Sequence, residues 1–432
     1  MDLLPKLAKL NPQLIRTAVV LHRSNQIPVD TYVIDLDMVR TNAHAIASSG
    51  NRSGLTSYMC TKQFGRNPLV CRAIMNSGIK KAMAMDIEGV KALHRYGIPI
   101  AHVGHFGQIP TGEVDYVLEK VNPEYVTVYS VEKAKQISDA AKKAGRIQNV
   151  FIKVIDQENT EIPAHTGGFE EKDAISFGKM ISKFPGIKVA GVTSYPAFYF
   201  SLKTKEHIVS RPFEKMVRVA RELRRESIDA REINAAGRNC AENNEVAAAS
   251  GATQVEPGQS FTGTLPHMAL LDDTPELPAI AYVTEISHMR GKIALAYGDS
   301  YMPTAVFGSL KSDIHHEYLT ACVGDDPDKA VENKVLARRQ EYFHDDATWF
   351  TYVNLLPESV EKLSVGDSVV FGFRPQIYRI SSRGRVAVVD GIRSGKPRLL
   401  GLFDRGGTLI TRENEDPVGI DYQAVRKLMD SV

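Results

Sequence analysis

The stretch SYMCTKQFGRNP, residues 57–68, joins an apolar run to a loop through a single lysine, Lys62. Successive side chains of an extended run alternate between two faces, so Tyr58, Cys60 and Lys62 share one face. If that face points into a core, Lys62 lies at the mouth of a pocket. A lysine at the end of a strand is usually exposed to solvent instead. The rest of the chain decides whether Lys62 lies in a pocket or in solvent.

The run that ends just before Thr61 and Lys62 is the first of eight short apolar runs. They span residues 55–60, 81–85, 100–104, 125–129, 150–155, 188–193, 231–235 and 253–256. Segments with helical spacing separate most of them, and the clearest begins at Pro212, where Phe213, Met216 and Val219 start an apolar stripe. This alternation predicts an α/β fold, a parallel (β/α)8 TIM barrel.

A doubly wound sheet is the alternative, because a count of strands does not prove that the barrel closes. Its usual nucleotide-binding form lacks support, since no GxGxxG follows the first strand and no GxxxxGK[ST] occurs.

The pattern changes near residue 270 to short strand-like runs separated by Gly, Pro and Asp turns, which predicts a C-terminal β-rich domain. We therefore expect four parts. They are an amphipathic helical segment (1–30), the barrel (31–268), the β domain (269–411) and a polar tail (412–432). The strand-like run TYVIDLDMV, residues 31–39, precedes the barrel strands, so we expect it to pair with the β domain.

Composition excludes several classes of protein. The 432 residues carry a net charge of +2 with acids and bases interspersed, which gives no basis for binding nucleic acid or an anionic membrane. The N-terminal segment fits neither a signal peptide nor a membrane span. The four cysteines show no metal-type pairing and do not form a disulfide framework. We expect a cytoplasmic protein whose partners are small molecules or another subunit.

Catalytic groups of a (β/α)8 barrel come from the C-terminal ends of its strands. The polar side chains at those ends are Lys62, Arg66, His105, Gln108, His165, Ser194, Asn234 and Glu256. Taken singly, each histidine fits a hydrogen-bonded structural role and Glu256 fits a salt bridge. Together they suit an aldehyde cofactor with a phosphate, because a lysine forms an imine, glycine-rich turns present N–H groups to a phosphate and a carboxylate keeps a ring nitrogen protonated. Pyridoxal phosphate (PLP) requires all three.

Several motifs resemble one known family. The VIDLD strand that enters a helix, the lysine after the first barrel strand and the Pro-Gly after the eighth are similar to the alanine-racemase-type PLP enzymes of fold type III. The segments MCTKQFGRNP, GHFGQIP, VEPGQSFTGT and TEISHMRG resemble its YhfX branch more specifically. The resemblance spans roughly residues 30–400 and implies a barrel followed by a β domain.

The resemblance also implies roles for individual residues. Lys62 would carry the cofactor and act as one base at the substrate's α-carbon. Tyr297, in GKIALAYGDSY, would be the opposite base, delivered across a homodimer interface, with Tyr301 as the fallback. The phosphate would lie against Gly237, Gly258 and Gln259, and Arg66 takes the place of a tyrosine that contacts the phosphate.

Departures from the family pattern bear on the substrate. Glu256 stands where alanine racemases place an arginine. A carboxylate at this position favours a protonated ring, which is a stronger electron sink. Ser194 replaces a histidine near the ring, and Phe373, next to Arg374, replaces a tyrosine that reaches the phosphate. The resemblance therefore does not imply alanine as the substrate. The candidates for substrate recognition are His105, Gln108 and His165.

These features predict a PLP-dependent amino-acid racemase or epimerase. A PLP-dependent lyase, aldolase or dehydratase is the first alternative, and a PLP-binding regulatory protein without turnover is the second. We expect no metal ion, because the only clusters in the β domain, His315-His316 and His344-Asp345-Asp346, lack zinc-type spacing.

Overall fold

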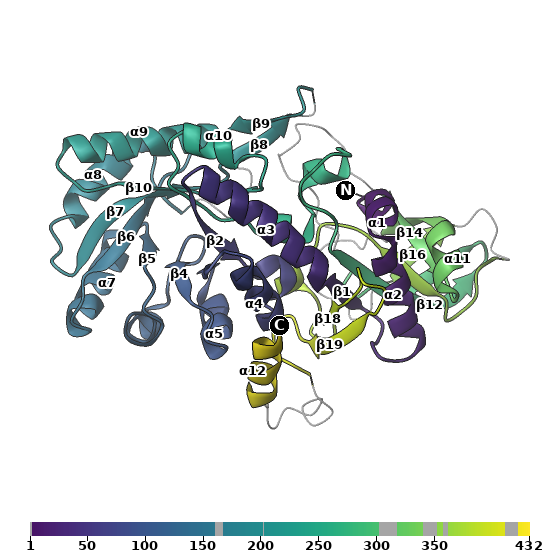
Figure 1. The fold of residues 1–432 in the computed structure, drawn as a ribbon. Coiled ribbons are helices and arrows are strands. Elements are labelled where there is room, and N and C mark those ends of the chain that lie inside the picture. The colour runs from purple at the N-terminus through teal and green to yellow at the C-terminus, as the bar shows by residue number, and fades with distance from the viewer. Residues whose placement is uncertain are drawn as a thin grey trace.

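A computed structural model describes residues 2–159, 167–201, 203–301, 318–339, 352–356, 362–410 and 422–432. Within these ranges, eight parallel strands form a closed barrel in the order β10-β11-β2-β3-β4-β5-β6-β7 (Figure 1). The strands are β2 (Thr56–Cys60), β3 (Lys81–Ala84), β4 (Ile100–Val103), β5 (Tyr125–Val128), β6 (Gln148–Lys153), β7 (Ile187–Ser194), β10 (Glu232–Ala235) and β11 (Gln254–Val255). All eight coincide with the predicted runs, so the barrel is confirmed and the doubly wound sheet is excluded.

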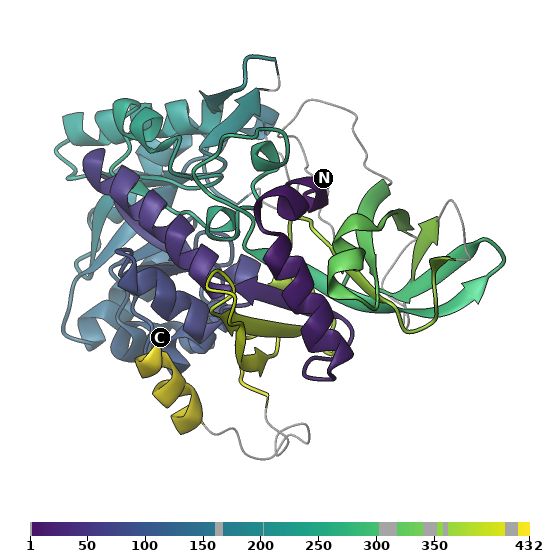
Figure 2. The same cartoon turned by 45° about the vertical axis from the view of Figure 1, so that its right-hand side comes forward.

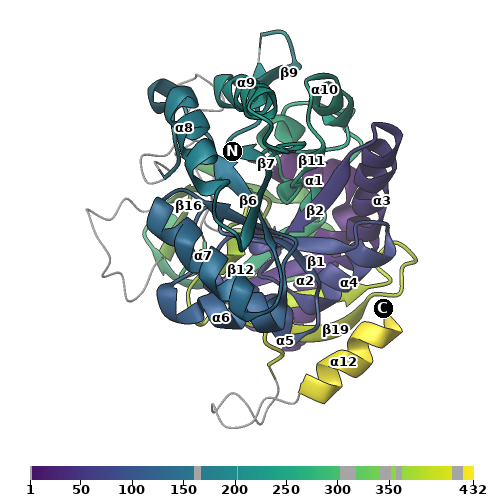
Figure 3. The same ribbon diagram turned by 90° about the vertical axis from the view of Figure 1, so that its left-hand side faces the viewer.

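Helices surround the barrel strands, as the view in Figure 3 shows. They are α3 (Leu36–Arg52), α4 (Pro68–Asn76), α5 (Ile87–Arg95), α6 (Val114–Tyr116), α7 (Val131–Lys143), α8 (Glu171–Ile181), α9 (Arg211–Arg225) and α10 (Asn244–Ala249). The predicted stripe of α9 is buried, and Pro212 lies in its first turn behind the capping hydroxyl of Ser210.

The first barrel strand has the predicted alternation. Tyr58 and Cys60 pack with Met83 and Ala101 in one buried cluster, whereas Met59 packs in the core that includes the surrounding helices. The face that carries Tyr58 and Cys60 therefore points into the barrel.

The second sheet has nine strands in the described residues, in the order β13-β16-β15-β14-β17-β12-β1-β18-β19. They are β1 (Thr31–Asp35), β12 (Ile280–Arg290), β13 (Ile293–Tyr297), β14 (Tyr318–Gly324), β15 (Lys334–Arg339), β16 (Tyr352–Leu356), β17 (Ser368–Phe371), β18 (Arg385–Asp390) and β19 (Arg398–Phe403). Strand β1 pairs antiparallel with β12 and parallel with β18, so the early strand lies in the interior of this sheet.

Two expectations about the N-terminal region were wrong in detail. The run 31–39 is a strand only to Asp35, because the Asp35 carboxylate accepts a hydrogen bond from the Met38 N–H at 3.1 Å and caps α3. The N-terminal segment is two helices, α1 (Leu4–Leu10) and α2 (Pro12–Arg23), since Pro12 starts a new helix. Figure 2 shows these helices lying along the second sheet.

Other segments depart from the predicted pattern. A hairpin of β8 (Phe198–Ser201) and β9 (Glu206–Val209) follows β7 and was not predicted. The linker-like stretch at 270–278 is packed in part, since Glu276 is fully buried. Two short helices, α11 (Pro327–Glu332) and α12 (Tyr422–Ser431), pack on α2 and α4 respectively. In the part of the chain that the structure describes, no helix is long and apolar enough to cross a membrane.

Candidate active site

A cavity opens at the C-terminal ends of the barrel strands. Its enclosed volume is about 50 Å³, and it is continuous with open solvent. The predicted site residues that line it are Lys62, Gly237, Glu256, Gly258 and Gln259. They follow β2, β10 and β11, which are adjacent in the barrel. Residues almost 200 positions apart in the sequence therefore share one cavity because the barrel closes.

Lys62 begins the short 3-10 helix η1 (Lys62–Phe64), two residues after the end of β2. Its Nζ lies 5.4 Å from the ring centroid of Phe106 and 5.8 Å from that of Tyr378. Burial lowers the pKa of Lys62, and the positive charge of Arg374 lowers it further. A larger fraction of the amine is therefore unprotonated at neutral pH, which is the form that attacks a carbonyl.

Glu256 is buried in the same cavity and receives several polar contacts. One carboxylate oxygen lies 2.5 Å from Nδ1 of His102 and 3.0 Å from Nδ2 of Asn234. The other oxygen lies 3.4 Å from Nδ1 of His105. Burial alone would raise the pKa of Glu256, but the contacts with the two histidines outweigh it and hold this pKa well below its usual range. Glu256 is therefore an anion at neutral pH.

His105 and Gln108 lie elsewhere than at the cavity mouth where we expected them. His105 is fully buried against Glu256 and stacks on Phe106, and burial lowers its pKa to about 4. Gln108 donates to the carbonyl oxygens of Gly104 and Thr127 at 3.0 and 2.8 Å. His105 therefore supports Glu256, and Gln108 stabilises the loop after β4. His165 lies outside the described residues.

The glycines of the cavity leave room that a side chain would fill. A Cβ on Gly258 would lie 2.8 Å from the Gln63 side chain, and one on Gly237, which has φ +108°, would lie 2.7 Å from the ring of Tyr195. The N–H of Gly237 already donates to Asn239 at 3.0 Å. Gly237 therefore allows a ligand to approach the backbone closely, but its N–H is not free to bind a phosphate. Other groups have to supply the hydrogen-bond donors.

Three buried polar atoms around the site find no hydrogen-bond partner among the described residues. They are Oε1 of Gln63, Nε2 of Gln259 and Oγ of Ser194. Because a buried polar group without a partner is costly, native structures rarely leave several together. Together with the buried amine and carboxylate, they fit a polar ligand such as the expected phosphorylated cofactor.

The arginines that line the cavity are not the one that the sequence predicted, Arg66. Arg66 has φ +55° and its guanidinium pairs with Asp86 at 3.0 Å, and it does not line the cavity. Arg238 and Arg374 line it instead. Sequence reasoning named Arg374 only as the neighbour of Phe373, and it missed Arg238, although Arg238 directly follows the Gly237 turn.

The structure separates the two candidate tyrosines. Tyr297 ends β13 and is 37% exposed, so within one chain it faces solvent and not the cavity. Tyr301 is 3% exposed and packs with Tyr282, Phe371 and Phe373 in an aromatic cluster of its own domain. The metal candidates at 315–316 and 344–346 lie outside the described residues.

Sequence reasoning also missed two buried side chains inside the barrel. His102 contacts Glu256 from the middle of β4. Lys153 ends β6, is 2% exposed and has its pKa lowered to about 8 by burial. Its Nζ lies 5.1 Å from the ring centroid of Phe106, the ring that Lys62 also approaches. A lysine inside the apolar run VFIKVI, residues 150–155, was the available signal for Lys153.

Comparisons with known proteins agree with this architecture. The alanine racemase N-terminal domain matches residues 34–266, and the YhfX-like C-terminal domain matches residues 281–399. The chain is 29% identical to the uncharacterized protein YhfX of Escherichia coli (strain K12) over 401 residues, which cover 93% of this chain and 97% of that protein.

Two solved structures show the same fold at low sequence identity. D-threonine aldolase from Filomicrobium marinum superposes with a TM-score of 0.62 at 12% identity, over 88% of this chain and 95% of that one. Alanine racemase from Clostridium difficile 630, in complex with cycloserine, superposes with a TM-score of 0.56 at 14% identity, over 88% and 99%. The chain belongs to the alanine racemase N-terminal domain family, and it joins that barrel to a YhfX-like C-terminal domain.

Proposed function

We propose that the protein is a PLP-dependent enzyme that removes and returns the α-proton of an amino acid, as a racemase or epimerase does. The observation that carries this proposal is that the Lys62 amine and the Glu256 carboxylate line one cavity at the end of the barrel. When bound, PLP supplies an aldehyde that reacts with amines and a ring that withdraws electrons from the α-carbon.

Each part of the cofactor has a group of cavity residues that would bind it. Lys62 is the nucleophile, because its lowered pKa leaves more of the amine unprotonated. Glu256 would accept a hydrogen bond from the ring nitrogen and keep it protonated, since its carboxylate stays charged. The Gly258-Gln259 turn would hold the phosphate, and Arg238 and Arg374, which also line the cavity, would balance its negative charge.

Proton transfer needs a base on each side of the α-carbon. Lys62 takes the proton on one side. On the other side we place Tyr297 of the partner subunit, because this side chain is exposed in a single chain and cannot serve its own cavity from there. The enzyme is therefore a homodimer in this proposal. Its four cysteines are buried free thiols, and we place it in the cytoplasm.

Cofactor binding and turnover are tested separately. The protein, incubated with PLP, should show an absorbance band near ~420 nm. Borohydride reduction followed by peptide mapping should find the phosphopyridoxyl group on Lys62, and Lys62→Ala should lose both signals. A protein that binds no PLP contradicts the proposal.

The reaction is tested by exchange of the α-hydrogen for deuterium over a panel of amino acids offered as both enantiomers. A racemase exchanges deuterium and interconverts the enantiomers of its substrate. Cleavage of a β-hydroxy amino acid to an aldehyde, or its dehydration, would replace the racemase by a lyase. Cofactor binding without exchange on any amino acid would favour a regulatory protein.

A further inference from the structure

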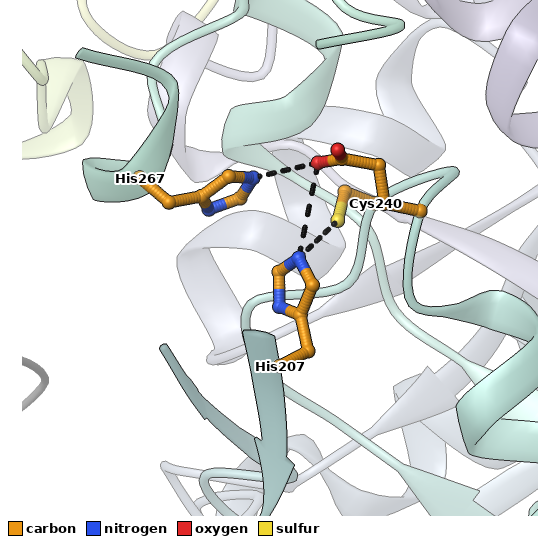
Figure 4. A group of neighbouring side chains, drawn as sticks. His207, Cys240 and His267 are labelled. Atoms are coloured by element: carbon orange, nitrogen blue, oxygen red, sulfur yellow. Dashed lines mark hydrogen bonds and ion pairs between the residues drawn. The ribbon is translucent and has the colours of Figure 1, made fainter. Parts of the chain in front are cut away.

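A second cluster of reactive side chains lies beside the cavity and has no part in the proposed reaction. It contains His207 from β9, Cys240 and Glu242 from the loop after β10, and His267 from the 3-10 helix η7 (Pro266–Ala269). Figure 4 shows His207, Cys240 and His267 pointing toward one another. Three separate segments, which follow β7, β10 and β11 in the chain, therefore contribute to one cluster.

The four side chains are close enough to bind a single ion. Nε2 of His267 lies 3.0 Å from Oε2 of Glu242, and Nε2 of His207 lies 3.8 Å from both that oxygen and Sγ of Cys240. All four candidate ligand atoms lie within 4.8 Å of one another. A tetrahedral zinc ion separates its ligand atoms by roughly 3.3–3.8 Å, as follows from bonds of about 2.0–2.3 Å. Small side-chain movements would therefore complete the shell.

The surroundings of the cluster are suited to a buried cation. Cys240 and His267 are 0% and 3% exposed. The ring of Phe200 stacks on His267 at 4.9 Å and meets His207 edge-on at 5.2 Å. This aromatic cover excludes water from one side, as is common around structural metal sites.

A second acidic side chain, Glu276, lies beside this cluster. Glu276 is fully buried, and one of its oxygens accepts the N–H of Ala241, the residue between Cys240 and Glu242. Its other oxygen has no partner within the described ranges. The nearby Lys6 amine donates instead to the carbonyl of Leu271 and the hydroxyl of Thr274. A divalent cation at the cluster would balance the negative charge of Glu242.

We propose that His207, Cys240, Glu242 and His267 bind one zinc ion. Two imidazole nitrogens, one thiolate and one carboxylate form a set that zinc prefers, and four protein ligands leave no open position, so the ion is structural. Nothing in the sequence spacing indicates the site, because the ligands come from three separate segments.

The ion would hold the loops that form the cofactor cavity. Cys240 directly follows Asn239, which accepts the N–H groups of Gly237 and Glu256 at 3.0 and 3.1 Å. His267 follows the Gly258-Gln259 turn through Leu265, which lines the cavity. Zinc therefore fixes the position of the turns after β10 and β11.

The test is the metal content of the full-length protein, purified without a histidine tag. Elemental analysis should find about one zinc per chain. After removal of zinc by a chelator, added Co²⁺ should give visible absorption bands together with a thiolate-to-cobalt charge-transfer band in the near ultraviolet. Both measurements are independent of PLP binding and of activity.

Variants assign the ligands. Cys240→Ser and His267→Gln should each lower the zinc content at least about tenfold, as expected when a ligand of a closed site is lost. Cys71→Ser, at another buried cysteine, should keep it. A wild-type protein that carries no zinc and takes up no cobalt overturns the proposal, as does wild-type zinc content in both ligand variants. If the variants do not fold, the cobalt titration of the wild-type protein decides, since a cobalt spectrum without the charge-transfer band excludes Cys240.

Discussion

Nδ1 of His102 lies 2.5 Å from the carboxylate of Glu256, and both side chains are buried inside the barrel. The opposite nitrogen of His102 lies 2.6 Å from the hydroxyl of Thr127, so the imidazole is held at both ends. This contact keeps Glu256 charged and fixed in direction. The residue that we expect to keep the cofactor ring protonated is thus positioned by β4, which lies across the barrel from β11.

Replacing Glu256 by glutamine should separate cofactor binding from catalysis. Glu256→Gln keeps the shape of the side chain but removes the charge that holds the ring proton. We expect PLP to remain attached to Lys62 while α-hydrogen exchange slows roughly 100- to 1,000-fold, the usual effect of losing one electrostatic contact to a reacting group. Exchange measured by mass spectrometry checks this, with Glu124→Gln, at the opposite end of the barrel, as the control. An unchanged exchange rate would remove Glu256 from the mechanism.

Replacing His102 should change stability and its dependence on pH. The His102→Leu variant leaves Glu256 and Thr127 short of a partner, which should cost about 1–3 kcal/mol in the free energy of unfolding. The lowered pKa of Glu256 stabilises the wild-type fold above the unfolded pKa of about 4.3, and this contribution is lost as the pH falls through the lower folded value. The difference between variant and wild type should therefore shrink below about pH 4.

Urea unfolding at several pH values measures this difference. His44→Ala, at an exposed position on α3, is the control and should change stability by less than about 0.5 kcal/mol. A difference for His102→Leu that is constant from neutral to acid pH would show that Glu256 is not the group stabilised by His102.

Lys153 should destabilise the fold in its charged form. Burial lowers its pKa to about 8, so below that pH the folded state carries a poorly solvated charge. Lys153→Met should raise the free energy of unfolding at pH 7 by up to about 3 kcal/mol, the equivalent of the lowered pKa. Because the wild type recovers stability as the pH rises from about 8 toward 10.4, the gain should be smaller at pH 10.

Denaturant titrations at both pH values provide the measurement for Lys153. The exposed Lys135→Met on α7 is the matched control and should show no such pH dependence. An equal gain at pH 7 and pH 10 would mean that packing, and not the buried charge, accounts for the effect.

Tyr297→Phe tests the second base. Since the side chain is exposed in one chain, the free energy of unfolding should change by less than about 0.5 kcal/mol. Racemisation should fall at least about 100-fold, the usual contribution of a general base, while Lys62 still exchanges the α-hydrogen of one enantiomer. Chiral chromatography follows the reaction. Tyr352→Phe is the control, because its ring lies 5.9 Å from that of Tyr297 on the neighbouring strand. Undiminished racemisation in Tyr297→Phe would exclude the two-base assignment.

The sequence by itself predicted the barrel, the β-rich domain and the interior face of the first strand. These features depend on local periodicity, which repeats along the chain and can be read without knowing the fold. Lys62 and Glu256 were found in the same way. Lys62 follows the first strand of the barrel and Glu256 ends the predicted eighth strand, and catalytic groups of such a barrel lie at these ends.

Contacts across the barrel could not be read from the sequence. His102 and Glu256 are separated by 154 residues, and their contact depends on closure and on the register of β4 and β11. His207, Cys240, Glu242 and His267 come from segments after three different strands, so their spacing resembles no metal motif. The pKa values of Lys62 and Lys153 depend on burial by distant segments. Local sequence determined the elements of this protein, whereas tertiary structure decided which side chains meet, because only the closed barrel brings the ends of distant strands together.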